Sequence, residues 1–243
     1  MKEHSAGNTV KKILLSFLGT ALIGLGSSLF KLASFGNDPC SALGYAFAQI
    51  LCLSENAFIA QYSGAFGMLM LNLILFIPML IWERKKISLG TAINVFGMSF
   101  IIALFDGIWS SLGLRSSNLP FYARILFALG GFLVQTFGVA LFVQADFGIG
   151  PYDAMNLLLS KKGGYLVGRI LTDVSCALIA LIISVFLLAP YRDPPDFFKR
   201  VFDSDATIVG WFTAVLMLLQ SPFITLWGKL LHKTVFKGQD TNI

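Results

Sequence analysis

The sequence predicts an all-α polytopic membrane protein, with six transmembrane helices arranged as two inverted three-helix repeats. Three observations predict it: a low content of charge, six long apolar stretches and an internal repeat. Of the 243 residues, 56% are hydrophobic and only 13% are charged, and the mean hydropathy is +0.76. Soluble domains carry about 25% charged residues. Most of this chain's surface must therefore face something other than water.

Six stretches are long enough, or nearly so, to cross a bilayer, which takes roughly 20 apolar residues of helix. They are continuously apolar, whereas the strands of an outer-membrane barrel alternate, so helices are expected. The fifth stretch is interrupted by one charge, Asp173. The first stretch follows two lysines like a signal peptide, but its length favours a retained span. The stretches are residues 13–30, 57–82, 87–105, 125–145, 170–189 and 206–227.

The internal repeat aligns residues 19–42 with residues 131–154 at an offset of 112, with nine of 24 positions identical. Both copies contain F-G-x-x-P. A weaker match relates Gly67-x-x-x-x-Asn72 in the second stretch to Gly168-x-x-x-x-Asp173 in the fifth. Because each unit has three spans, the second unit must enter the membrane from the opposite face, a plan common among secondary transporters.

The repeat divides the chain into two units. We expect the first three-span repeat at residues 1–112 and the second at 121–232, with a linker at 113–120 and a cytoplasmic tail at 233–243. With the N-terminus inside, twelve Lys and Arg residues fall on the inner side and six on the outer side. This distribution satisfies the positive-inside rule and predicts that both termini are cytoplasmic.

The F-G-x-x-P motif is expected to break one helix and to start another. Gly36 and Gly148 can end a helix by adopting positive φ. Pro39 and Pro151 suit the first turn of the helix that follows, where a missing N–H is harmless. Each motif is therefore a predicted break within a membrane unit.

The helices after the two motifs, residues 39–52 and 151–159, are too short to span a bilayer and are expected to be slanted or interfacial. Asp38 would cap the first one, and Gly150 would be a permissive cap for the second. Free N–H groups at such helix ends can bind an anionic group. The alternative is a structural break that only turns the chain.

Ionisable residues within spans are expensive and suggest a functional site. Asp173 is the main candidate, Asn72 is its counterpart in the second stretch, and Arg169 shares a helix face with Asp173. Asp153 could belong to a solvated inner vestibule. The alternative is a structural ion pair. Isolated polar residues in other spans are expected to hold helices together; they are Asn94, Gln135, Gln144 and Gln220. Lys31 is expected to extend its charged end to the membrane interface.

Several classes of function are not expected. The chain has no G-x-x-x-x-G-K-[ST], H-E-x-x-H or G-x-S-x-G motif, so we expect neither ATPase activity nor another enzyme activity. Its three cysteines have no C-x-x-C spacing and its two histidines lie in the tails, so no metal or cofactor is expected. The basic residues that give the net charge of +5 are distributed unevenly between the inner and outer loops, as in a membrane protein, so the charge does not indicate nucleic-acid binding.

The doubled pattern G-x-x-L-F-x-x-A-x-F-G-x-x-P-x-x-A, at residues 26–42 and 138–154, resembles the signature of the YitT/YczE-like bacterial integral membrane proteins. The resemblance implies a multi-pass protein of the bacterial plasma membrane that is transporter-like. It supplies no substrate and no catalytic residues. The first copy departs from the second at Asn37, Asp38, Cys40 and Ser41, so the two mouths of a pathway would differ in charge and width.

We therefore expect a secondary transporter or channel for a small solute, an anionic one included, that is driven by a gradient. One alternative is a non-transporting accessory or regulatory membrane protein. Another is the membrane substrate-binding subunit of a multi-chain importer. The expected partners are the lipid bilayer and a small solute, not nucleic acid. Association into a homo-oligomer or with other membrane subunits stays open.

Overall fold

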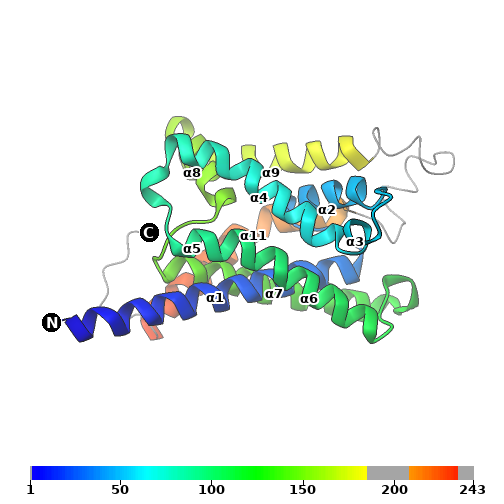
Figure 1. Ribbon diagram of the computed structural model, residues 1–243, viewed down its shortest axis with the longest axis horizontal. Coiled ribbons are helices and arrows are strands. Elements are labelled where there is room, and N and C mark those ends of the chain that lie inside the picture. Colours follow the sequence, from blue (N-terminus) through cyan, green and yellow to red (C-terminus); the bar gives the residue numbers. More distant parts are fainter. Residues whose placement is uncertain (1, 185–207, 235–243) are drawn as a thin grey trace.

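The computed structural model describes residues 2–184 and 208–234, in which every regular element is helical. The long helices run roughly along one axis of an elongated bundle (Figure 1). The α-helices are α1 (Lys2–Ala33), α2 (Pro39–Leu51), α3 (Ala57–Gln61), α4 (Ser63–Trp82), α5 (Leu89–Ala92), α6 (Met98–Ser111), α7 (Phe121–Gln144), α8 (Pro151–Gly163), α9 (Tyr165–Ile182) and α11 (Trp211–Thr234). Two 3₁₀ turns, η1 (Arg84–Lys86) and η3 (Ser116–Asn118), and a π-helical turn, η2 (Ile93–Gly97), lie between them.

Five helical stretches in the described residues are long and apolar enough to cross a membrane: Thr9–Ala33, Ser63–Trp82, Leu89–Asn118, Phe121–Gln144 and Trp211–Thr234. They correspond to five of the six stretches that the sequence predicts, so the all-helical membrane architecture is confirmed. The remaining stretch, residues 170–189, begins within α9, and its last five residues lie outside the described ones. Large apolar side chains cover the outside of the bundle, such as Phe100, Leu126 and Leu218, which are 68%, 66% and 75% exposed.

The second stretch is not one continuous helix, as the sequence suggested. Helix α3 ends at Gln61, and α4 starts at Ser63. The side chain of Asn56 caps the start of α3 by accepting hydrogen bonds from the amides of Phe58 and Ile59. The break between α3 and α4 lies at Tyr62, whose φ of -103° and ψ of 23° are not helical. The third stretch is also interrupted, because the π-helical turn η2 separates α5 from α6.

Helices α1 and α7 pack closely and run antiparallel. A Cβ added at Gly26 would lie 2.5 Å from Gln135 Cβ and 2.8 Å from the carbonyl oxygen of Gly131. A Cβ added at Gly19 would lie 2.9 Å from the carbonyl oxygen of Gly138. Small residues let helix backbones approach closely in membranes. These four glycines therefore set the distance between the two helices.

Both F-G-x-x-P motifs form the breaks that the sequence predicts. Gly36 has φ 110° and Gly148 has φ 109°, the left-handed region that glycine adopts without strain. Pro39 and Pro151 are the first residues of α2 and α8, which are 13 residues long each. The turns are also closely packed, since a Cβ added at Gly148 would lie 2.4 Å from Ser88 Oγ. The local prediction of a broken helix is confirmed at both motifs.

Helix α2 is buried inside the bundle, a feature that the expectation of a slanted or interfacial helix did not include. Nine of its 13 residues are buried, and it packs against α4 and α9. Small residues allow this: a Cβ added at Gly67 of α4 would lie 2.4 Å from the carbonyl oxygen of Gly44 of α2. Helix α8 is partly buried and continues to Gly163, four residues beyond the expected end.

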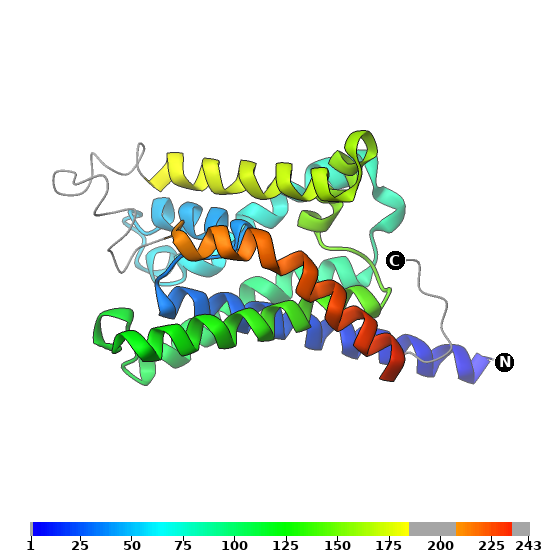
Figure 2. The same cartoon turned by 180° about the vertical axis from the view of Figure 1, so that it is seen from behind.

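The N-terminus of α1 and the C-terminal end of α11 lie at the same end of the bundle (Figures 1 and 2). Near this end Glu83, which follows α4, pairs with Lys161 of α8 at 2.5 Å and with Lys86 at 3.4 Å. The hydrogen bond from Lys161, more than the charge of Lys86, lowers the pKa of the Glu83 carboxyl below its ordinary value. This contact joins the ends of α4 and α8.

Candidate functional site

The candidate site is built around two charged side chains of α9. Arg169 and Asp173 are four residues apart on one face, and Arg169 Nε donates to Asp173 Oδ2 at 3.3 Å. Their side chains are only 7% and 3% exposed. The Tyr152 hydroxyl of α8 donates to Asp173 Oδ1. Asp153, the next residue of α8, forms an ion pair with the Arg169 guanidinium, with Oδ1 3.8 Å from Nη1. The ion pair that the sequence suggested therefore exists, with two further partners from α8.

A chain of buried hydrogen bonds continues from Arg169 to the other side of the bundle. Arg169 Nη2 donates to Gln220 Oε1 at 3.2 Å, and Gln220 Nε2 donates to Gln135 Oε1 at 3.0 Å. Gln135 Nε2 then donates to Asp38 Oδ1 at 2.7 Å and lies 3.1 Å from Ser27 Oγ. We call the whole set the central polar cluster: Ser27, Asp38, Ser41, Gln135, Tyr152, Asp153, Arg169, Asp173 and Gln220.

The first turns of both broken helices contribute to the central polar cluster. Asp38 is the N-cap of α2, and its Oδ2 accepts from the amide of Ser41 at 3.1 Å. Gly150 is the N-cap of α8 and has no side chain with which to cap it, and Tyr152 and Asp153 lie in the first turn of this helix. The capping role predicted for Asp38 is confirmed. The N-terminal ends of α2 and α8 favour the negative charge placed beside them.

The charges of the central polar cluster do not balance. Among the described residues it contains the carboxylates of Asp38, Asp153 and Asp173 and one guanidinium, that of Arg169. If all four groups are ionised, three negative charges meet one positive charge, which leaves a net charge of −2. Unbalanced charge inside a membrane protein is costly. A bound proton or cation would reduce this imbalance, whereas an anion would increase it.

The other residues that the sequence singled out contribute no side-chain hydrogen bond to the central polar cluster in the described part of the chain. The turn residues Gly36, Pro39, Gly148 and Pro151 place the helix starts and offer no polar side chain. Asn72 is buried at 2% exposure, and its Nδ2 has no hydrogen-bond partner in the part of the chain that the structure describes. No hydrogen bond within these residues joins Asn72 to Asp173, its counterpart in the repeat.

The residues that sequence reasoning missed are Gln135, Gln220 and Tyr152. The two glutamines were expected only to hold helices together, yet they connect Asp38 with Arg169. Each glutamine is a single strongly polar residue in the middle of an apolar helix and is at most 5% exposed. Tyr152 follows the proline of the second motif. These isolated positions were the available signal. The partners of the two glutamines are 51 to 108 residues away in sequence, and the partner of Tyr152 is 21 residues away.

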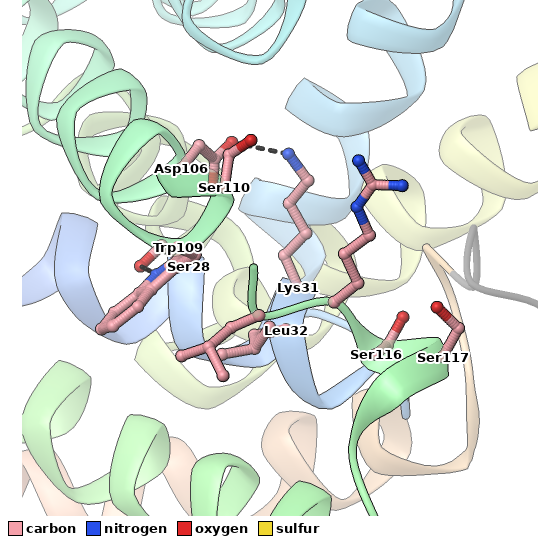
Figure 3. Close-up of a pocket in the computed structure, with 10 residues that line it drawn as sticks. Ser28, Lys31, Leu32, Asp106, Trp109, Ser110, Ser116 and Ser117 are labelled. Carbon is pink, nitrogen blue, oxygen red and sulfur yellow. Dashed lines mark hydrogen bonds and ion pairs between the residues drawn. The ribbon is translucent and has the colours of Figure 1, made fainter. Parts of the chain in front are cut away.

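A cavity of about 390 Å³ lies at the end of the bundle away from the N-terminus (Figure 3). We call it the distal cavity. Lys31 Nζ and Asp106 Oδ2 face each other there at 2.6 Å, and Trp109 Nε1 donates to Ser28 Oγ at 3.1 Å. Lys31, which the sequence suggested would only extend to the interface, is thus held in an ion pair between α1 and α6.

Comparison with known proteins agrees with this helical membrane architecture. Residues 10–192 match the family of unknown function DUF6198. The chain belongs to this family. An uncharacterized protein of Haemophilus influenzae is 29% identical over 154 residues, which are 63% of this chain and 62% of that protein. The uncharacterized membrane protein YczE of Bacillus subtilis is 26% identical over 150 residues, 61% of this chain and 63% of that protein.

The similarity to YczE and the DUF6198 match support a YczE-like membrane protein, as the doubled motif suggested. The chain matches less than two thirds of the length of either relative. No solved structure matches the chain.

Proposed function

We propose that this chain is a secondary transporter of the plasma membrane that moves a small solute with a proton or another cation. The observation that carries the proposal is the central polar cluster. In it the carboxylates of Asp38 and Asp173 and the guanidinium of Arg169 are buried between helices of both halves of the chain, and the Asp153 carboxylate beside them is 31% exposed. Buried acids of this kind mark ion pathways and proton relays in membrane proteins. We propose no catalytic step and no bound cofactor.

The proposal includes an inverted repeat of two three-span units, residues 1–112 and 121–232. The contacts between α1 and α7 support it. Adding the offset of 112 turns Gly19 into Gly131 and Gly26 into Gly138. The contact of Gly19 with Gly138 thereby becomes the contact of Gly131 with Gly26, which is the second observed contact. This reciprocity is expected of two units related by a pseudo-two-fold axis.

The packing of the broken helices supports the same repeat. A Cβ added at Gly67 would meet Gly44 and Ala48 of α2, and a Cβ added at Gly168 would meet Asn156 and Ser160 of α8. The two contacted positions in α8 are those of α2 shifted by 112. A sixth span, begun by α9, completes the second unit in this proposal.

The central polar cluster lies where the two proposed units meet. Ser27 and Asp38 come from the first unit, whereas Gln135, Arg169 and Asp173 come from the second. A rocking motion of one unit against the other would break the Gln135–Asp38 hydrogen bond, whose atoms are 2.7 Å apart. Protonation or cation binding at the carboxylates would favour one arrangement over the other. This is the coupling that alternating access requires.

Reconstitution of the purified chain alone in liposomes tests the proposal. Uptake of a broad panel of labelled metabolites is measured with an imposed pH gradient and without one. We expect gradient-dependent uptake of at least one solute, and its loss in Asp173→Asn. The matched control is Asp146→Asn, since the Asp146 side chain is 89% exposed and outside the cluster. No uptake of any solute would favour an accessory protein, or an importer subunit if a stoichiometric ATPase pair co-purifies.

Labelling of single cysteines tests the proposed orientation, with both termini cytoplasmic. Cys40, Cys52 and Cys176 are first replaced, and one new cysteine is placed at Lys85 or Lys161. We expect neither position to react with a membrane-impermeant reagent added to intact cells. Reaction of both from outside would reverse the orientation.

A further inference from the structure

The distal cavity differs in charge from the central polar cluster. It is lined by two cationic side chains, Lys31 and Arg115, and one carboxylate, Asp106. Lys31 and Asp106 pair at 2.6 Å, with side chains 48% and 23% exposed. Within the described residues Arg115 makes no salt bridge. One positive charge therefore has no counter-charge in the cavity, and an anion would supply it.

A buried tyrosine, Tyr45, lies beside the ion pair of Lys31 and Asp106. Tyr45 of α2 is 5% exposed, and its hydroxyl has no hydrogen-bond partner in the described part of the chain. An unsatisfied buried polar group is unfavourable and calls for a partner. The Lys31 ammonium lies 5.2 Å from the centre of the Tyr45 ring. A Cβ added at Gly64 would lie 3.3 Å from Asp106 Oδ2 and 3.8 Å from Tyr45 Cε1. Side chains of α1, α2 and α6 thus meet at the start of α4.

Helix α2 connects the distal cavity to the central polar cluster. Tyr45 lies two turns along the helix that Asp38 caps, and its ring centre lies 5.2 Å from the ammonium of Lys31. A change in the position of the Lys31–Asp106 pair therefore reaches the helix whose N-terminus forms the cluster.

The remaining walls of the distal cavity indicate which anions fit. Three lining residues are apolar or aromatic, Leu32, Trp109 and Leu114, and four are serines. Ser116 and Ser117 lie on the opposite side of the cavity from Trp109 (Figure 3). A carboxylate presents two acceptor oxygens to the donors of Lys31 and Arg115, and its short organic body can contact the leucines and Trp109. The volume of about 390 Å³ is that of a site for a small organic molecule, within the usual range of roughly 300–1,000 Å³.

We propose that the distal cavity binds a small organic carboxylate, with Lys31 and Arg115 holding its carboxylate group and Trp109 flanking its body. The inference rests on the proposed function only in naming the class of solute that is transported. The anion and the coupling proton or cation then occupy different sites. This agrees with the excess of positive charge in the distal cavity and the excess of carboxylates in the central polar cluster.

Tryptophan fluorescence tests the site directly. Trp82, Trp211 and Trp227 are replaced by Phe, so that Trp109 is the remaining fluorophore. The purified chain in detergent is titrated with sodium succinate and sodium pyruvate, against sodium chloride at constant ionic strength. We expect a saturable change in emission with at least one carboxylate and none with chloride. Arg115→Gln should raise the half-saturating concentration at least fivefold, whereas Arg84→Gln, at the opposite end of the bundle, should leave it unchanged.

The outcomes separate the site from the transport function. The proposal fails if no carboxylate gives a saturable response, or if Arg115→Gln responds like the parent. It also fails if the response needs phosphatidylglycerol vesicles, because the anion is then a lipid headgroup. Saturable carboxylate binding by a chain that transports nothing in liposomes would support the site and refute the proposed transport.

Discussion

Replacement of Arg169 by glutamine should destabilise the chain strongly, because three groups depend on its guanidinium. The substitution removes the hydrogen bonds to Asp173 and Gln220, at 3.3 Å and 3.2 Å, and the ion pair with Asp153 at 3.8 Å. The Asp173 side chain is 3% exposed, so water cannot replace the lost cation. Two carboxylates are left without their counter-charge.

The expected loss follows from the burial of the pair. Removing one partner of a buried ion pair typically lowers the free energy of unfolding by about 3–5 kcal/mol. For soluble chains of 150–250 residues, each kcal/mol shifts the melting temperature by roughly 2–4 °C. We therefore expect Arg169→Gln to melt about 6–20 °C below the parent.

A second substitution separates charge from packing. Asp173→Asn in the Arg169→Gln background removes the carboxylate that has lost its partner, so the double variant should recover more than half of the lost stability. The measurement is the midpoint of heat-induced loss of the monomer peak in detergent, at one fixed heating rate. Arg169→Gln within about 2 °C of the parent would refute the reasoning. A double variant that falls by the sum of the single losses would refute it as well.

Three other predictions concern packing and charge at single positions. Gly26→Ala should lower the apparent melting temperature, because overpacking costs about 1–3 kcal/mol. Gly130→Ala, whose added Cβ would have no atom within 4 Å, should raise the melting temperature or leave it unchanged. Equal effects of the two substitutions would contradict the close contact of α1 and α7. Glu83→Gln should lower the melting temperature at pH 7, because the lowered pKa of the Glu83 carboxyl means that its ionised form stabilises the fold above the unfolded pKa. The difference in melting temperature from the parent should disappear as pH falls below about 4. A difference that grows at low pH would contradict the predicted sign of this effect. Gly148→Ala should cost more folded protein than Gly164→Ala, since φ is positive at both, 109° and 83°, but only Gly148 has an atom within 4 Å of the added Cβ; equal yields in detergent would rule out the packing part.

Features fixed by neighbouring residues could be predicted from the sequence. The apolar stretches predicted the long helices, and F-G-x-x-P predicted positive φ at Gly36 and Gly148 and helix starts at Pro39 and Pro151. The pair of Arg169 and Asp173 followed from their spacing of four residues. Each of these depends on backbone preference or on one turn of helix, so the pattern alone contains the information.

Features made by helix packing could not be predicted in this way. The contacts of Gln135 with Asp38 and with Gln220 join residues 97 and 85 positions apart. Their partners depend on how α1, α2, α7 and α11 are rotated and spaced, which apolar sequence does not specify. The burial of α2 could not be predicted for the same reason, because it depends on how α4 and α9 pack around this helix. The Lys31–Asp106 pair likewise spans 75 residues.

Proton movement through the reconstituted chain tests the central claim most directly. Liposomes loaded with the pH-sensitive dye pyranine and containing the purified protein are exposed to sodium succinate or sodium pyruvate under an imposed membrane potential. We expect solute-dependent acidification of the lumen with the parent and with Asp146→Asn, and none with Asp173→Asn, although all three are folded. Equal acidification by the parent and Asp173→Asn, or none by the parent with any solute that it takes up, would contradict proton coupling at the central polar cluster.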